Sequence, residues 1–283
     1  FGLYFNTIKY LKFFQIIYRF KPKNKNFFPR FSSRDFKKRP LSNLPKPFIN
    51  KKASLNSLEE FNFLNQKANF EIIGWDFSKM SPLWHYNQNY FDWLITKDFI
   101  SNKNINNNLI NSWIDNNPLG KDISWDSYPT SLRIVNWIKH SIISDAKDSK
   151  FLLSLFYQSS WLLRNLEWHL MANHLFSNAK ALIFSGLFFE GKFSDVFLNK
   201  GIEIINAQIE EQILFDGGHF ELSPMYHSII LEDLIDILNI FRVYSYENKN
   251  LKRKIEKKVT KMIYWLSKMT FPGGELSFFN DTA

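Results

Sequence analysis

The stretch that decides the fold is residues 150–189, with the sequence KFLLSLFYQSSWLLRNLEWHLMANHLFSNAKALIFSGLFF. Its apolar residues recur every three to four positions, which predicts two long helices, at about 150–171 and 174–189. The break between them is short, so the two helices are expected to pack antiparallel. This stretch therefore predicts a protein built from helical hairpins.

The same spacing continues on both sides of this stretch. Helices are predicted at about 109–116, after Pro129, and at about 196–214, 225–246 and 251–269, with a further helix start at 87–94 and a helical pattern from about Ser57 onward. Few β-branched alternations interrupt them. The predicted fold is all-α, either an (α/α) toroid of helical hairpins or a less regular helical array. No repeat of 20–50 residues is visible, which disfavours a regular solenoid.

The composition fits one large domain with an appendage. Of the 283 residues, 45% are hydrophobic and 18% are aromatic. Such a content suits a packed core or a cleft in which rings stack on sugar faces. The chain has no cysteine, which excludes disulfides, thiol catalysis and a thiolate metal site. The chain contains no uninterrupted run of eighteen apolar residues, so no membrane span is predicted.

The charge is concentrated at the N-terminus. Residues 1–55 hold fourteen Lys or Arg and one acid, Asp35, a net +13, whereas the remainder holds 22 basic and 26 acidic residues, a net −4. Residues 1–20 can form an amphipathic helix, and the five prolines of 21–55 predict a linker. We therefore divide the chain into a basic arm, 1–55, and a helical domain, 56–283. The body is not a nucleic-acid binder. The arm is either a solvated leader or a contact for acidic polysaccharide or acidic lipid, with 1–20 as a candidate peripheral membrane segment.

Four of the six histidines fall between residues 169 and 227. Two of them, His169 and His174, lie four residues from Asn173 and Asn178 respectively, so each pair is expected to share a helix face. One interpretation is a polar contact between helices, since buried polar groups must be hydrogen-bonded. The other is a functional Asn173–His174 pair. No HExxH motif is present, so nothing supports zinc hydrolysis. An Asn, a His and a Tyr acting together would need neither a metal nor an organic cofactor.

A second unusual segment is residues 216–227, DGGHFELSPMYH. Asp-Gly-Gly predicts a turn, Ser223 is a good N-cap, and Pro224 suits the first helical position. Tyr226 then lies in the first turn, where the helix dipole favours a phenolate or a bound anion. The alternative is an ordinary capped helix whose Tyr226 packs against a neighbour.

Asn, His and Tyr together suit β-elimination on uronic acids. An amide neutralises the sugar carboxylate, a His or Tyr removes the C5 proton, and a Tyr protonates the leaving oxygen at C4. Residues 125–133 add rings and a cation, with Trp125 and Tyr128 for stacking and Arg133 for bidentate binding of a carboxylate. Alternatively, these rings pack in the hydrophobic core and do not contact a sugar.

Together these strings resemble the heparinase II/III-like family over about residues 60–283. The strings are 84–86 and 90–94 (WHY and YFDWL), 128–137 (YPTSLRIVNW), 173–182 (NHLFSNAKAL), 216–227 and 279–281 (FND). The resemblance implies an incomplete (α/α) toroid followed by an antiparallel β-sandwich, which is expected to lie beyond this chain and to supply a further His. On this view the chain is the N-terminal part of a longer protein, and the isolated piece is weak or inactive.

The resemblance also implies β-elimination on acidic polysaccharides such as heparan sulfate, with roles for individual residues. Asn173 neutralises the carboxylate, and Tyr226 is the acid and a candidate base. His174 supports catalysis, and His227, His219 and Glu221 are candidates for binding substrate. Leu222 departs from the family pattern, where an Arg is expected.

Two other functions remain open. A toroid glycoside hydrolase would need two carboxylates facing across a cleft, for which Asp216 and Glu221 are weak candidates. A non-catalytic polysaccharide-binding module of an envelope assembly system would need none of this chemistry. A periplasmic or envelope location is the favoured expectation, with a cytoplasmic one as the alternative.

Overall fold

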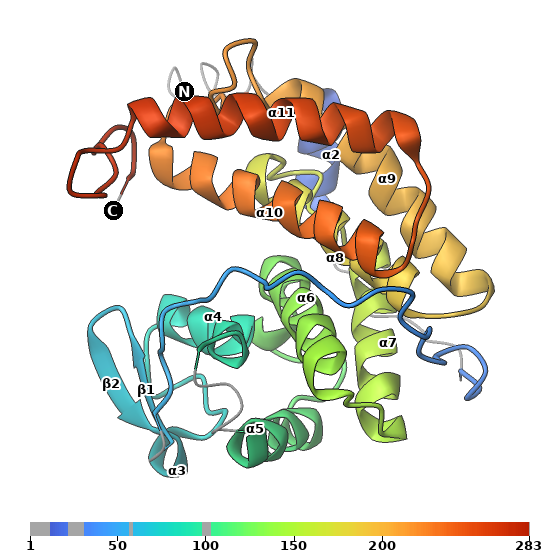
Figure 1. The fold of residues 1–283 in the computed structure, drawn as a ribbon. Coiled ribbons are helices and arrows are strands. Elements are labelled where there is room, and N and C mark those ends of the chain that lie inside the picture. The colour runs from blue at the N-terminus through green and yellow to red at the C-terminus, as the bar shows by residue number, and fades with distance from the viewer. Residues whose placement is uncertain (1–11, 22–30, 57–58, 98–102, 283) are drawn as a thin grey trace.

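The computed structural model describes residues 12–21, 31–56, 59–97 and 103–282, and this part is largely helical (Figure 1). The elements are α2 (Phe13–Phe20), β1 (Glu60–Phe63), β2 (Gln66–Asn69), α3 (Phe70–Ile73), α4 (Pro82–Tyr90), η1 (Asp92–Leu94), α5 (Lys103–Asn116), η2 (Ile123–Trp125), α6 (Ser127–Ser144), α7 (Ser149–Arg164), α8 (Ala172–Phe188), α9 (Lys192–Gln212), α10 (Pro224–Val243) and α11 (Lys249–Lys268). Among the described residues, no helix combines the length and the apolar character needed to cross a membrane.

The helices form an arc of hairpins in two layers. In the inner layer α4 contacts α6, α6 contacts α8, and α8 contacts α10. Each of the last three is followed by an outer partner, in the pairs α6–α7, α8–α9 and α10–α11 (Figure 1). This arrangement confirms the predicted incomplete (α/α) toroid.

The sequences of the helices explain their layers. On α8 every residue from Leu175 to Phe188 is buried, as expected for a helix with neighbours on all sides. On α11, by contrast, three residues are buried, Leu251, Ile255 and Met262, and its other faces carry lysines. A helix with one narrow apolar stripe belongs on the outside of the arc.

Two glycines let α8 and α9 approach closely. A Cβ at Gly186 would lie 2.5 Å from the backbone nitrogen of Leu198, and one at Gly201 would lie 2.8 Å from the carbonyl oxygen of Ala179. Any larger residue would force the two backbones apart. This close contact fixes the position of α8, whose N-terminal end carries Asn173 and His174.

Two predicted boundaries are wrong. The helical pattern expected from Ser57 is instead a β-hairpin over 60–69, because Leu64 and Asn65 adopt positive φ angles of 53° and 60° that turn the chain back. The helix expected at 150–171 ends at Arg164, and 165–171 form a loop that we call the α7–α8 loop. Its backbone is held by the amide of Asn178, whose oxygen accepts from the N–H of Glu167 at 2.9 Å.

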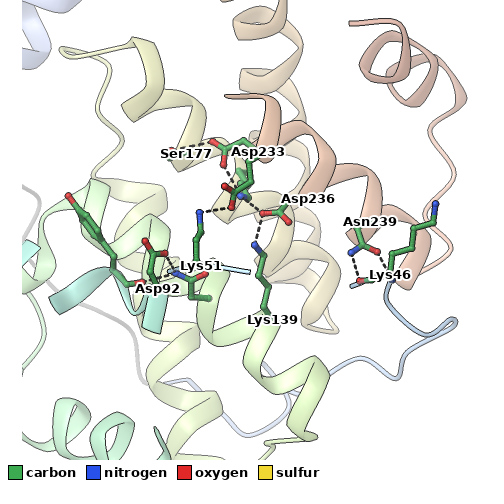
Figure 2. A network of polar contacts seen from close by, with 12 residues as sticks. Lys46, Lys51, Asp92, Lys139, Ser177, Asp233, Asp236 and Asn239 are labelled. Atoms are coloured by element: carbon green, nitrogen blue, oxygen red, sulfur yellow. Dashed lines mark hydrogen bonds and ion pairs between the residues drawn. The ribbon is translucent and has the colours of Figure 1, made fainter. Parts of the chain in front are cut away.

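Residues 31–55, which we call the strap, run in extended form across the arc between α10 and α6 (Figure 1). The Arg39 side chain donates to two carbonyls at the end of α8, and Ser42 N–H donates to the carbonyl of Val243 at the end of α10. Further along, the amide of Asn239 both accepts from and donates to the backbone of Lys46 (Figure 2). The strap therefore connects helices far apart in sequence.

A buried ionic cluster joins three of the inner helices, α6, α8 and α10 (Figure 2). Asp236 of α10 lies 2.6 Å from Lys139 Nζ of α6 and 2.5 Å from Lys180 Nζ of α8, and Lys180 also lies 2.7 Å from Asp233. Burial alone would raise the pKa of Asp236, but Lys180 and Lys139 hold it down at about 2. Burial would likewise lower the pKa of Lys180, but Asp233 and Asp236 raise it. The cluster is therefore an interdependent set of charges.

Candidate active site

A cavity of about 550 Å³ opens at one end of the inner helices. It is lined by the first turns of α6, α8 and α10, the α7–α8 loop, one face of α4, and Tyr18 and Lys21 of the arm. Its volume lies within the range of about 300–1,000 Å³ typical of ligand sites. Of the predicted site residues, the cavity brings together Tyr128, Asn173, His174 and Tyr226.

Three helix N-termini supply a favourable field for an anion at this cavity. The first turns of α6, α8 and α10 all contribute lining residues, and the positive ends of helix dipoles lie at such turns. The chain is strained where two of these helices begin, because Met171, Ala172 and Leu222 have φ angles of 58°, 44° and 55°. Each such residue costs roughly 1–3 kcal/mol, and strain of this kind is concentrated at functional sites. Leu222 itself is exposed and lies outside the cavity lining.

Tyr128 links the two residues of the Asn173–His174 pair. Its phenol accepts a hydrogen bond from the amide of Asn173, and its ring lies 4.4 Å from that of His174. Burial raises the pKa of Tyr128, which keeps the phenol protonated. Tyr128 therefore positions both neighbours, a role that the stacking prediction did not include.

A carboxylate that the sequence did not single out holds His174. Glu167 Oε1 lies 3.2 Å from His174 Nδ1, and Glu167 Oε2 accepts from Asn178 Nδ2 at 3.0 Å. Asn178 lies one turn after His174 on α8, so the predicted shared face of these two residues is confirmed. The spacing of His174 and Asn178 was therefore the feature of the sequence that could have indicated a shared polar partner such as Glu167. The other predicted pair is wrong, because His169 lies in the α7–α8 loop rather than on a helix with Asn173.

Tyr226 lies where the capping pattern predicts. The side chain of Ser223 accepts from the Tyr226 N–H at 3.5 Å, and Pro224 occupies the first turn. The capped start of α10 is confirmed, and it directs Tyr226 into the cavity lining. The sequence did not single out Asp126, which accepts from the Tyr86 hydroxyl at 2.6 Å on the cavity wall.

Arg133 and Trp125 do not line the cavity, so their predicted contact with substrate is wrong. Arg133 is fully buried; its Nε donates to Gln158 Oε1 at 2.8 Å, and its guanidinium lies 4.0 Å from the centre of the Trp113 ring. Trp125 is also buried and donates to the carbonyl of Asn117. Both side chains lie in the core, where the alternative interpretation placed the ring of Trp125.

His219, His227 and Glu221 also lie outside the cavity lining. His219 and His227 are fully buried: His219 Nε2 lies 3.1 Å from Gln212 Oε1, and His227 Nε2 lies 3.0 Å from the carbonyl oxygen of Met262. Burial lowers the pKa of His219 to about 4 and also lowers that of His227. Burial raises the pKa of Glu221, whose Oε2 lies 3.7 Å from His219 Nδ1. His219 and Glu221 lie at the turn before α10, and His227 packs against α11. The full burial of the two histidines contradicts their predicted contact with substrate, whereas the contact of the partly exposed Glu221 stays a prediction.

Known proteins with similar sequences and folds are polysaccharide lyases. A heparin-sulfate lyase of Bacteroides stercoris is 34% identical over 110 residues, which cover 38% of this chain and 16% of that protein. A heparin-sulfate lyase of Pedobacter heparinus is 25% identical over 183 residues, which cover 60% of this chain and 27% of that protein.

The fold is similar to that of a solved heparinase III. The TM-score is 0.59 at 19% identity, over 92% of this chain and 43% of that one. This chain thus spans less than half the length of these relatives. Residues 73–283 match the family model described as the heparinase II/III N-terminus, which covers most of the chain. The chain therefore belongs to the heparinase II/III family.

Proposed function

We propose that the protein cleaves a uronic-acid-containing acidic polysaccharide, either heparan-sulfate-like or a bacterial exopolysaccharide, by β-elimination. One observation carries this proposal: the amide of Asn173, the imidazole of His174 and the phenol of Tyr226 line one cavity beside three helix N-termini. The heparin-sulfate lyases among the relatives support a polysaccharide substrate.

Asn173 is proposed to neutralise the uronate carboxylate. The C5 proton of a uronic acid is weakly acidic as long as its carboxylate keeps its full charge. An amide N–H directed at the carboxylate stabilises the charge that develops as the proton leaves. Asn173 suits this role because its side chain lines the cavity and hydrogen-bonds with the phenol of Tyr128.

His174 and Tyr226 are proposed to move the protons. With Nδ1–H donated to Glu167, His174 Nε2 carries the lone pair and takes the C5 proton. The C5–H electrons form the C4=C5 double bond as the C4–O bond breaks. Tyr226 then donates its phenolic proton to the leaving oxygen, and the proton held on His174 restores the phenol. The products are an unsaturated uronate and a new chain end.

The test uses the protein as its gene encodes it, with heparan sulfate as substrate. The ultraviolet absorbance of unsaturated uronate is followed for Asn173→Ala, His174→Gln and Tyr226→Phe, with Tyr264→Phe as the control because Tyr264 is exposed on α11. We expect each of the first three variants to lose at least about 100-fold in kcat, the lower range for a general acid or base and for one group that stabilises the charge of the transition state. Full activity of Tyr226→Phe would refute the mechanism, and full activity of His174→Gln would transfer the role of base to Tyr226.

One observation favours a glycoside hydrolase as the second candidate. The cavity lining includes two carboxylates, Asp126 and Glu167, although both already accept hydrogen bonds from neighbouring side chains. Hydrolysis would give new reducing ends without a rise in ultraviolet absorbance, so the same assay separates the two reactions. Binding without any cleavage would indicate a non-catalytic module.

A further inference from the structure

We propose that the arm helix α2 forms a substrate-selecting wall of the cavity, in which Lys21 binds an anionic group of the polysaccharide and Tyr18 supports it. This inference rests on the proposed function for its substrate class. Both residues line the same cavity as Asn173 and Tyr226. Both also lie outside residues 73–283, the part that matches the family model. The wall is thus formed by residues that precede the segment matched by the family model.

Three contacts hold α2 against the cavity. Lys12 Nζ lies 2.7 Å from Glu211 Oε1 of α9, Gln15 Nε2 donates to the carbonyl of His169 at 3.4 Å, and the ring of Tyr18 lies 6.2 Å from that of Trp168. The three arm residues are spaced by three, so they share one side of the helix. That side rests on the α7–α8 loop, which carries Glu167, and on the C-terminal end of α9.

Lys21 follows the last turn of α2 and is exposed at the cavity. Its Nζ lies 4.9 Å from the centre of the Tyr18 ring, and no carboxylate of the described residues lies within ion-pair distance of it. Tyr18 therefore directs this ammonium group without neutralising it. A sulfate or carboxylate on a sugar next to the reacting uronate would complete the pair.

The acidic residues of the cavity interact with side chains other than Lys21. Asp126 accepts from the Tyr86 hydroxyl, and Glu167 is held by His174 and Asn178. Neither carboxylate forms an ion pair with Lys21, so its ammonium group can pair with an anionic group of a bound polymer. An acidic chain, whose charges repeat with every disaccharide, is favoured over a neutral chain.

The experiment compares Lys21→Gln with Arg19→Gln in the protein as encoded. Arg19 is exposed in the last turn of α2, two residues before Lys21, and lies outside the cavity lining, so its loss removes the same charge from the same segment. We expect Lys21→Gln to raise KM for heparan sulfate roughly five-fold with kcat unchanged, the scale of one partly exposed ion pair. Arg19→Gln should change neither constant. Equal effects of the two variants would overturn the proposal.

Two polymers identify the group that Lys21 binds. If the effect persists on unsulfated heparosan, Lys21 binds a carboxylate; if it is confined to heparan sulfate, Lys21 binds a sulfate. Either result supports the wall. Tyr18→Leu should reproduce the KM effect and Tyr18→Phe should not, because the ring directs the ammonium group.

Direct binding separates this inference from the proposed function. The Tyr226→Phe protein, with and without Lys21→Gln, is titrated with heparan sulfate by calorimetry and, separately, with anionic phosphatidylglycerol vesicles. Weaker polysaccharide binding in the Lys21→Gln protein supports the wall even if no unsaturated product ever forms. A loss confined to the vesicles would overturn it and assign α2 to a membrane surface. Normal cleavage with unchanged binding in the Lys21→Gln protein would overturn the proposed role of Lys21 and leave the proposed function intact.

Discussion

The ring of His174 lies against the ring of Tyr128, with 4.4 Å between their centroids and 36° between their planes. The same phenol accepts a hydrogen bond from the amide of Asn173. One side chain on α6 thus fixes two adjacent groups on α8. In the proposed reaction Tyr128 is a positioning residue, since its raised pKa keeps the phenol neutral.

Replacing Tyr128 separates its two contacts. Tyr128→Phe keeps the ring against His174 but removes the acceptor for Asn173, so we expect kcat to fall by about 2- to 10-fold, the value of one hydrogen bond. Tyr128→Leu removes both contacts and should lower kcat further. Steady-state kinetics on heparan sulfate measures both variants, and equal rates for Phe and Leu would show that the ring contact contributes nothing.

Glu167→Gln tests the orientation of His174. The amide keeps the shape of the side chain but offers Nδ1 one acceptor without a charge, so we expect kcat to fall about ten-fold or more. KM should stay level or fall, because an acidic substrate meets one negative charge fewer. The control is Glu190→Gln, which removes a partly exposed carboxylate paired with Lys37. A rise in KM with unchanged kcat would contradict the assigned role.

Lys180→Met tests the buried ionic cluster. The substitution leaves Asp233 and Asp236 without their shared cation, and an unpaired buried charge costs about 3–5 kcal/mol in the free energy of unfolding. The matched control is Lys200→Met, which breaks an exposed pair with Glu203 and should cost less than about 1 kcal/mol. Urea denaturation gives both values, and similar losses would mean that the cluster does not act as a unit.

The lowered pKa of His219 predicts how the free energy of unfolding depends on pH. Its pKa is about 4 in the folded protein and about 6.5 when unfolded, so below pH 6.5 the unfolded chain gains a proton that the folded protein excludes. The contribution of neutral His219 is complete above pH 6.5 and falls by roughly 3 kcal/mol as the pH drops to 4. His227 acts in the same direction, whereas Glu221, with its raised pKa, opposes it.

The measurement is the free energy of unfolding from urea titrations between pH 4 and 7. His219→Gln retains a polar partner for Gln212 but cannot titrate, so its stability should vary less with pH over this range. The slope rather than the absolute stability is compared, because the variant is also expected to be less stable. A slope equal to that of the unsubstituted protein would contradict this account.

Local chemistry predicted much of the fold and part of the site. The cap formed by Ser223 and Pro224 is a short-range property, so the start of α10 and the place of Tyr226 could be predicted from a few residues. The spacing of His174 and Asn178 likewise indicated a shared polar face. The spacing of apolar residues is also a local property, so it predicted the helical hairpins of the toroid.

What the sequence could not predict depends on contacts between distant segments. Arg133 has the charge of a substrate-binding residue, but Gln158 and Trp113, each at least twenty residues away, hold it in the core. Glu167 entered the site because α7 ends seven residues earlier than its apolar pattern suggests. Tyr18 and Lys21 reach the cavity through a docking of the arm that no local pattern encodes.

The strap has a consequence for the order in which the protein is made. Residues 39–46 leave the ribosome early, but their partners at Asn239 and Val243 are about two hundred residues further along the chain. The strap, which is rich in basic residues, therefore lacks its partners while most of the helices are synthesised and pair with their neighbours. Contacts of such long sequence separation form slowly. The residues of the strap are thus made before most of the helices but are among the last to reach their native positions, and they close the arc only when α10 is complete.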